Sequence, residues 1–356
     1  SRSYLQSDSN VKKISAHITK KVADRLEEIF KNERKSLEDK WDNLKLFIEY
    51  GMLSDDKFYE RAEKFALLKN CDDKYFSFEE YKSAIEPNQT DKEKRLIYLY
   101  TTDKEAQYSY IESARSKGYD VLIFDGQLDS HYVNLLESKF KDSKFSRVDS
   151  DYIDKIIRKE ETPANNLSES DTNFLSKAFE SVYPTYATFG VSVENLGEES
   201  APVIITQSEF MRRYREMAAL NGGMNFYGQL PESYNVIVNS SSPVISAILE
   251  TKEEQIGDLL SQIEKDASNP ESELKALKEK SAKLKPEEVT TEDRDRISSL
   301  EKEIEQIENR KRETIKEFAK SNVLINQLCD LSLLSNNILK GESLNRFIKR
   351  SYSILK

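Results

Sequence analysis

The sequence predicts a mixed α+β and α/β fold. A helical segment comes first, then a small α/β sheet unit, then an α+β C-terminal domain with an inserted coiled-coil-like helical hairpin. Two changes in the hydrophobic pattern indicate this order. Apolar residues recur at three- and four-residue steps up to about residue 85 and then gather in short continuous runs. Between residues 251 and 320 charged side chains dominate and only narrow apolar stripes remain. The 356 residues suffice for two or three domains, each with its own core.

Residues 1–85 are expected to be mainly helical. Ile14, Ile18 and Val22 recur at four-residue steps among Lys and Glu, which is typical of an amphipathic helix. A second stripe begins at Trp41 and is expected to end at Gly51. Near the end of this region Ser77 stands three residues before Glu80, the spacing of a helix capping box, and this predicts a short capped helix.

Residues 90–150 have the pattern of a small parallel sheet. The apolar runs Leu96–Tyr100 and Val121–Phe124, and a third strand expected near 145–148, are separated by helical stretches at 103–117 and 128–139. Continuous apolar runs are expected of strands covered on both faces, and the β-α-β-α-β order favours parallel pairing. No G-x-G-x-x-G follows a strand, so we exclude a dinucleotide site. The first domain is therefore placed at 1–159.

A polar stretch at 160–172 is interpreted as a linker to a C-terminal domain at 173–356. In that domain strands are expected at 186–193, 203–206 and 234–238. A helix is expected at 207–220, ended by Asn221-Gly222-Gly223.

The charged stretch at 251–320 is predicted to form an antiparallel helical hairpin with coiled-coil seams. Ile297, Leu300 and Ile304 follow alternating three- and four-residue spacing, and shorter stripes precede them. Pro270 and Pro286 are expected to interrupt the hairpin with turns. The pattern leaves open whether these helices bind a partner or are simply solvated.

Two apolar helices are predicted after residue 322, separated by Gly341. They carry more apolar surface than two short helices bury on each other, which favours a four-helix bundle with a second subunit. The alternative is docking against the chain's own C-terminal sheet. The candidate interface residues are Leu324, Leu328, Leu331, Leu334, Ile338, Leu344, Phe347, Ile348, Tyr352 and Leu355.

Composition excludes several classes of protein. The net charge of −10 disfavours a general binder of nucleic acid or of anionic membranes. No apolar run of membrane length and no signal peptide is present, so we expect a cytoplasmic protein fragment. Cys71 and Cys329 are far apart in sequence, and two histidines cannot complete a convincing metal site with them, so no metal is expected. Whether either thiol is reactive depends on burial.

Several motifs, in this order and spacing, make the chain resemble the ninety-kilodalton heat-shock chaperone family in its bacterial form. They cover nearly the whole chain, although no single string is diagnostic. The matching segments are Ser1–Gln6, Val11–Ile14, Phe78–Tyr81, Ile97–Asp103, Gly118–Leu122, Leu128-Asp129, Asp330–Leu334 and Leu344–Arg350. The resemblance implies the second part of the family's middle domain followed by its C-terminal dimerisation domain, with the N-terminal ATP-binding domain absent.

The resemblance assigns a role to Arg2 and Gln6, which lie four residues apart and share a face if their segment is helical. In the family, this loop reaches the γ-phosphate of ATP held by the N-terminal domain. Arg2 would neutralise charge on the transferred phosphoryl group and Gln6 would hold the loop. ATP and Mg²⁺ are implied for the full-length protein and no cofactor for this fragment, which is expected to lack ATPase activity.

The resemblance also implies a surface for non-native client proteins. Phe210, Met211, Tyr214 and Met217 lie at helical steps, a stripe that would otherwise be interpreted as ordinary core. A second contact is expected around His131 and Tyr132, where the family carries an acidic residue followed by Trp or Tyr.

The expected partners are a second copy of the chain, client proteins and the absent ATPase domain. The 251–320 hairpin departs from the family pattern as an insertion of about 60 residues, whose role the resemblance does not supply. An alternative function is a coiled-coil scaffold that works through this hairpin.

Overall fold

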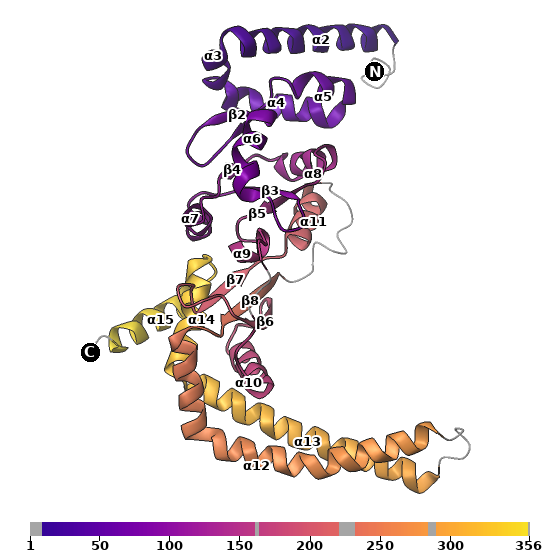
Figure 1. The fold of residues 1–356 in the computed structure, drawn as a ribbon, viewed down its shortest axis with the longest axis vertical. Coiled ribbons are helices and arrows are strands. Elements are labelled where there is room, and N and C mark those ends of the chain that lie inside the picture. Colours follow the sequence, from indigo (N-terminus) through magenta and orange to yellow (C-terminus); the bar gives the residue numbers. More distant parts are fainter. Residues whose placement is uncertain (1–8, 161–163, 221–231, 284–289, 355–356) are drawn as a thin grey trace. The chain divides into compact units, whose positions relative to one another are not determined.

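The chain folds into two compact units in a computed structural model (Figure 1). The structure describes residues 9–160, 164–220, 232–283 and 290–354, with side chains for all of these except residues 9–12, 15, 216–220 and 354. Unit 1 comprises residues 1–161 and 207–230, and unit 2 comprises residues 162–206 and 231–356. The helix after residue 207, expected in the C-terminal domain, therefore groups with the first unit.

Unit 1 contains helices and two small sheets, with labels as in Figure 1. Its helices are α2 Ser9–Asn32, α3 Arg34–Glu38, α4 Trp41–Ser54, α5 Asp56–Ala62, α6 Phe78–Gln89, α7 Tyr108–Ser116, α8 Asp129–Lys139, α9 Ile153–Ile156 and α11 Glu209–Leu220. Its strands are β1 Leu67–Lys69, β2 Tyr75–Ser77, β3 Leu96–Thr101, β4 Val121–Ile123 and β5 Ser143–Arg147.

Unit 2 contains one mixed sheet and five helices among its described residues. Its strands are β6 Thr188–Glu194, β7 Val203–Thr206 and β8 Ser233–Asn239. Its helices are α10 Glu169–Glu180, α12 Pro243–Ala282, α13 Thr291–Ser321, α14 Val323–Ser335 and α15 Gly341–Ile354.

The first helices of unit 1 follow the predicted pattern with two differences. Gly51 does not end its helix, because α4 continues to Ser54. A Cβ at Gly51 would lie 2.5 Å from the Phe58 ring, so glycine is needed here for close packing within the helix pair rather than for a turn. The short antiparallel hairpin of β1 and β2 was not predicted, because three-residue strands carry too little periodicity.

The predicted parallel sheet is present, in the order β4-β3-β5. β3 pairs in parallel with both neighbours and is buried along its whole length, as its continuous apolar run indicated. Tyr98 of β3 stacks on Phe145 of β5 with ring centroids 4.6 Å apart. The capping box at Ser77 is also confirmed, since its side chain accepts from the Glu80 N–H and the Glu80 carboxylate accepts from the Ser77 N–H.

In unit 2 the sheet order is β6-β8-β7, with β6 parallel and β7 antiparallel to the central strand. Helix α10 starts at Glu169, inside the stretch interpreted as a linker. Its cap explains this start, because the Ser168 side chain accepts from the Asp171 N–H. Phe174 and Phe179 of α10 are buried in the core of this unit.

Helices α12 and α13 lie side by side and antiparallel (Figure 1). Ion pairs link them along their length, for example Glu264 to Lys311 at 2.9 Å and Glu273 to Arg296 at 2.6 Å. The expected interruption at Pro270 is wrong: α12 runs through it, and the ring is buried. Burial offsets the hydrogen bond that a proline removes from a helix. Pro286 lies outside the described residues.

Helices α14 and α15 end the described chain. The Asn322 side chain caps α14 by accepting from the Ile325 N–H at 3.0 Å. Gly341 is the first residue of α15 and has a backbone φ of +59°, a conformation that favours glycine.

Candidate functional site

Helix α11 presents two different faces. Phe210 is 74% exposed and Tyr214 43% exposed, and their rings stack with centroids 6.3 Å apart. Met211 is half-buried. The side chain of Met217, the fourth residue of the predicted stripe, lies outside the described residues. The two aromatic residues are thus an outward-facing pair and not core.

The other face of α11 carries a buried ionic network that the sequence reasoning missed. Glu209 accepts from the Tyr100 hydroxyl at 2.5 Å, from Arg212 Nη2 at 2.8 Å and from Arg213 Nε at 2.6 Å. Its second oxygen accepts from the Arg147 backbone N–H at 3.0 Å. Burial alone would raise the pKa of Glu209, but the charges of Arg212 and Arg213 outweigh it and lower that pKa.

Arg213 joins α11 to two further elements of unit 1. Its Nη1 donates to Glu137 Oε2 at 2.7 Å and to Asn134 Oδ1 at 3.0 Å, both on α8. Its Nη2 donates to the Phe145 carbonyl of β5 at 2.7 Å. Five donors in a fixed fork suit this arrangement, which a lysine could not reproduce. Arg213 therefore fixes the orientation of the helix.

The network occupies a particular place in the α/β unit. Tyr100 lies near the carboxyl end of β3, and Arg147 is the last residue of β5. The crevice beyond the carboxyl ends of adjacent parallel strands is where α/β proteins usually bind ligands. Here Glu209 of α11 accepts hydrogen bonds from Tyr100 and Arg147 at this end of the sheet. These contacts position the helix that carries Phe210 and Tyr214.

The second predicted client contact receives less support. Tyr132 is only 1% exposed, its ring lies edge-on to Phe124, and its hydroxyl lies 3.7 Å from Met52 Sδ. His131, beside it on α8, is half-buried. A ring inside the core offers a client no surface in this conformation.

The predicted interface on α14 and α15 divides into exposed and buried residues. Leu328 and Phe347 are buried, and Ile338 and Leu344 are partly buried, so these four stabilise the unit itself. Leu355 lies outside the described residues. The predicted residues that are exposed in the single chain are Leu324, Leu331, Leu334, Ile348 and Tyr352.

A polar clamp holds these two helices together. Arg350 of α15 donates to Asp330 Oδ2 at 2.6 Å, to Gln327 Oε1 at 2.9 Å and to the Asn326 carbonyl at 3.0 Å, all on α14. The exposed leucines are therefore presented by a fixed helix pair. The apolar stripe of this helix pair is recognisable in the sequence, whereas the clamp is not.

The remaining candidates are placed as follows. Arg2 and Gln6 lie outside the described residues. Cys71 and Cys329 are buried free thiols; burial raises the pKa of Cys71 to about 11 and also raises that of Cys329. Buried thiols with raised pKa values are poor nucleophiles at neutral pH. No group of three or more metal-binding side chains, and no helix able to cross a membrane, occurs among the described residues.

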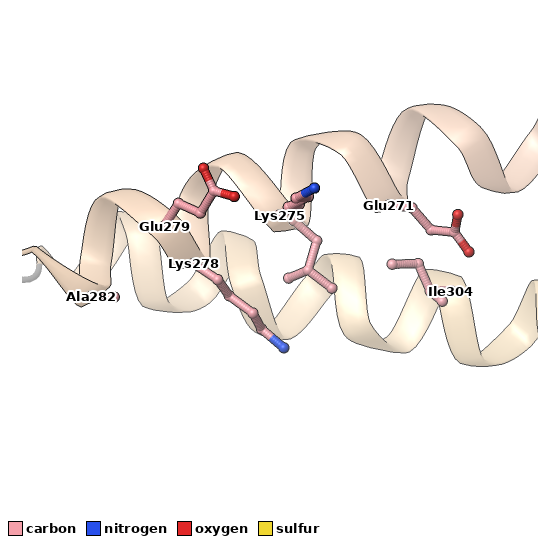
Figure 2. Close-up of a pocket in the computed structure, with 7 residues that line it drawn as sticks. Glu271, Lys275, Lys278, Glu279, Ala282 and Ile304 are labelled. Atoms are coloured by element: carbon pink, nitrogen blue, oxygen red, sulfur yellow. The ribbon is translucent and has the colours of Figure 1, made fainter.

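The α12/α13 pair carries a shallow groove of about 540 Å³ near its tip. Leu274 and Ile304 form its apolar part, and Glu271, Lys275 and Lys278 flank it (Figure 2). Nothing in this groove resembles a catalytic arrangement.

Comparison with known proteins shows which family the chain belongs to. A family model described as "Hsp90 protein" matches residues 1–267. The chain is 47% identical over 357 residues to "Chaperone protein HtpG" of Bacteroides thetaiotaomicron, and 48% identical over 358 residues to "Chaperone protein HtpG" of Porphyromonas gingivalis. These matches cover 100% of this chain and 52% of each relative. The protein of the same name in Oceanobacillus iheyensis is 28% identical over 211 residues, 58% of this chain and 32% of the relative.

Together the fold and these matches place the chain in the Hsp90 class of heat-shock proteins. The chain belongs to the Hsp90 family. It spans about half the length of the curated relatives it matches, 52% in both cases above.

The insertion predicted at 251–320 stays a prediction, but it is not peculiar to this chain. The Bacteroides match covers the whole of this 356-residue chain in 357 positions, which leaves room for almost no gap. That relative therefore carries a stretch of the same length between the last strand and the terminal helices.

Proposed function

We propose that this chain is the client-binding and self-associating part of an ATP-dependent chaperone. Membership of the Hsp90 family supports the class of function. The observation that carries the assignment is the stacked, exposed pair Phe210 and Tyr214 on a helix whose opposite face is fixed by a buried ionic network.

Non-native proteins expose apolar side chains that folded proteins bury, so a surface that holds them needs apolar area without a deep, selective pocket. The Phe210 and Tyr214 rings supply this area, and the adjacent Met211 supplies an adaptable thioether. Because Arg212 and Arg213 anchor the helix, the rings remain available to a client instead of turning inward. Binding by such a surface depends on accessible apolar area rather than on client sequence.

Replacing both rings, Phe210→Ser with Tyr214→Ser, is expected to weaken client binding several-fold without changing the fold. The substitutions remove apolar area that a client would bury, and each Å² of buried apolar area contributes about 25 cal/mol to binding. The measurement is light scattering of heat-unfolded citrate synthase in the presence of this chain.

Phe47→Ser is the matched control, because Phe47 is an equally exposed aromatic residue on α4, at 75%. It should protect the client as well as the wild type does. Equal protection by the double variant would contradict the assignment of the α11 surface.

Self-association follows from the second exposed surface. Leu324, Leu331 and Leu334 of α14 and Ile348 and Tyr352 of α15 form an apolar face that the single chain leaves exposed. A second copy would bury it in a four-helix arrangement. Two client surfaces would then be carried by one dimer.

The nucleotide belongs to the part of the longer protein that this chain does not span. ATP and Mg²⁺ would be held there, and they would supply the free energy of clamp closure. Arg2 would contact the γ-phosphate and Gln6 would position that loop. This chain alone is expected to turn over no nucleotide.

Arg2→Ala in the full-length protein is expected to reduce ATP hydrolysis about tenfold or more, with little change in nucleotide affinity, because a γ-phosphate contact stabilises mainly the transition state. Steady-state hydrolysis and equilibrium binding of a fluorescent nucleotide measure the two effects. An unchanged hydrolysis rate would remove Arg2 from the mechanism.

A further inference from the structure

A cavity of about 590 Å³ lies within unit 1 at the carboxyl ends of β3 and β4. The two strands are parallel, so their ends reach the same edge of the sheet. Trp41, Ile123 and Phe124 contribute apolar lining, and Thr102, at the end of β3, also lines the cavity. The space is large enough for a small organic molecule, and none of its lining residues belongs to the surfaces assigned above.

One face of α4 supplies the buried polar groups of this cavity. Trp41, Lys45 and Glu49 stand four residues apart, so they share one side of the helix. Glu49 is only 2% exposed. Its nearest described cation is Lys45, whose Nζ lies 3.9 Å from the carboxyl oxygen, beyond hydrogen-bonding distance.

The charges around Lys45 do not balance. Its Nζ lies 3.2 Å from Asp129 Oδ2 and 3.5 Å from Asp125 Oδ1. Asp129 is also buried, and no described donor reaches its Oδ1. A single ammonium thus faces two buried carboxyl groups, Glu49 and Asp129, and a third at the rim.

The protonation of Glu49 agrees with this shortage of positive charge. Burial raises the pKa of Glu49 to about 8; the charge of Lys45 opposes the rise, and those of Asp129 and Asp125 add to it. Burial thus favours the protonated form of Glu49. A second cation would allow both groups to be ionised.

The other two amines of the cavity already have close partners. Lys69 Nζ lies 3.0 Å from Asp42 Oδ2, and Lys104 Nζ donates to the Cys71 carbonyl at 2.7 Å. In contrast, the carboxyl oxygens of Asp73 lie 3.6 Å from the nearest described amines, Lys69 Nζ and Lys104 Nζ. The cavity therefore holds more acceptors than close donors, and a ligand that donates hydrogen bonds would complete it.

We propose that this cavity binds a small organic cation, a primary ammonium or guanidinium group, that donates to Glu49 and Asp125. The Trp41 ring lines the same space, and aromatic rings attract such cations, whereas the Phe124 ring already has Lys45 Nζ 5.8 Å from its centroid. The described residues contain no cluster of three or more metal-binding side chains, which favours an organic cation over a metal ion. A free diamine and an arginine side chain of a bound polypeptide share this chemistry.

Binding is coupled to a proton. A cation beside Glu49 favours its ionised form, so binding releases a proton wherever free Glu49 is protonated, below about pH 8. Affinity is therefore expected to rise with pH up to that value and then level off. The groups that set this response are Lys45 on the same helix, Asp129 on α8 and Asp125 in the preceding loop.

The test is calorimetric titration of this chain with agmatine, which carries an amine and a guanidinium. Binding is expected at pH 7. If one proton is released to the buffer, the measured binding enthalpy should differ between two buffers by the difference in their ionisation enthalpies. Glu49→Gln should weaken it by about tenfold to a hundredfold, because a charge-assisted hydrogen bond is lost. Glu60→Gln, at an exposed position on α5, is the control and should bind as the wild type does.

Absence of binding at millimolar agmatine, or equal affinity for Glu49→Gln, would overturn the proposal. Thermal melting checks that Glu49→Gln is folded. If it is not, Asp125→Asn replaces it, because that side chain is 66% exposed and serves no core contact. Tighter binding of agmatine than of acetyl-arginine amide would indicate a free diamine as the ligand, and the reverse order a polypeptide side chain.

Discussion

Replacing Leu331 and Leu334 with aspartate is expected to convert a dimer of about twice 41.2 kDa into a monomer. Both side chains are exposed in the single chain, so the change should leave the monomer folded. In the interface each leucine contributes about 1.5–3 kcal/mol by burial, and a carboxylate in its place would be desolvated. We therefore expect dimer affinity to fall by about a hundredfold or more. Multi-angle light scattering over a concentration series measures it.

Ser299→Asp is the control for this experiment, since Ser299 is an exposed residue on α13 that belongs to neither surface. It should remain dimeric. A wild-type chain that is monomeric at every concentration would refute self-association through α14 and α15. A double variant that stays dimeric would place the interface elsewhere.

Removing the guanidinium of Arg213 is expected to destabilise the docking of α11 by about 1.5–3 kcal/mol, the range for a hydrogen bond to a charged group, because Glu209 keeps its contact with Arg212. Arg213→Ala deprives Glu209 of a 2.6 Å contact and Glu137 of a 2.7 Å contact. Hydrogen exchange should then speed up in residues 209–215 while the β3 amides stay protected. Arg310→Ala, which breaks an exposed ion pair with Asp266, should cost at most about 1 kcal/mol.

The pH dependence gives a second readout of the same network. The folded pKa of Glu209 lies below its ordinary value of 4.5, so its stabilising contribution is fully present above pH 4.5. It should be lost as the pH falls through the lowered pKa, and Glu209→Gln should remove that loss. Exchange in α11 that is unchanged in Arg213→Ala would contradict the anchoring role.

Much of the fold could be predicted because each feature has a local cause. The capping box at Ser77 needs only a hydroxyl and a carboxylate three residues apart. The nearly continuous apolar run at Leu96–Thr101 predicts a central strand, because a strand that is covered on both faces is apolar along its whole length. The exposed leucines of α14 were also recognisable as an excess of apolar surface.

The differences have tertiary causes. Gly51 lies inside α4 because the Phe58 ring takes the space of its Cβ, and Pro270 stays helical because it is buried beside α13. Neither neighbour can be identified from spacing alone. In both cases packing overrides the usual effect of a helix-breaking residue.

The candidate site was predicted only in part, for a related reason. The aromatic residues of α11 were recognisable by their helical steps, but the steps alone indicated ordinary core, and only the family resemblance indicated a client surface. Glu209, Arg212 and Arg213, which position them, resemble the solvated charges of any surface helix, and their buried partner Tyr100 lies more than a hundred residues away. Tyr132 shows the opposite error, because a tyrosine in a suggestive motif turned out to be core.

The central claim is that α11 holds non-native clients, and site-specific photo-crosslinking tests it most directly. A photoreactive residue is placed at Phe210, at Phe47 or at Ser299, and the chain is mixed with heat-unfolded citrate synthase. We expect client adducts at position 210 and few at positions 47 and 299. Adducts mainly at position 299 would favour a scaffold that works through α12 and α13, and no preference for position 210 would contradict the claim.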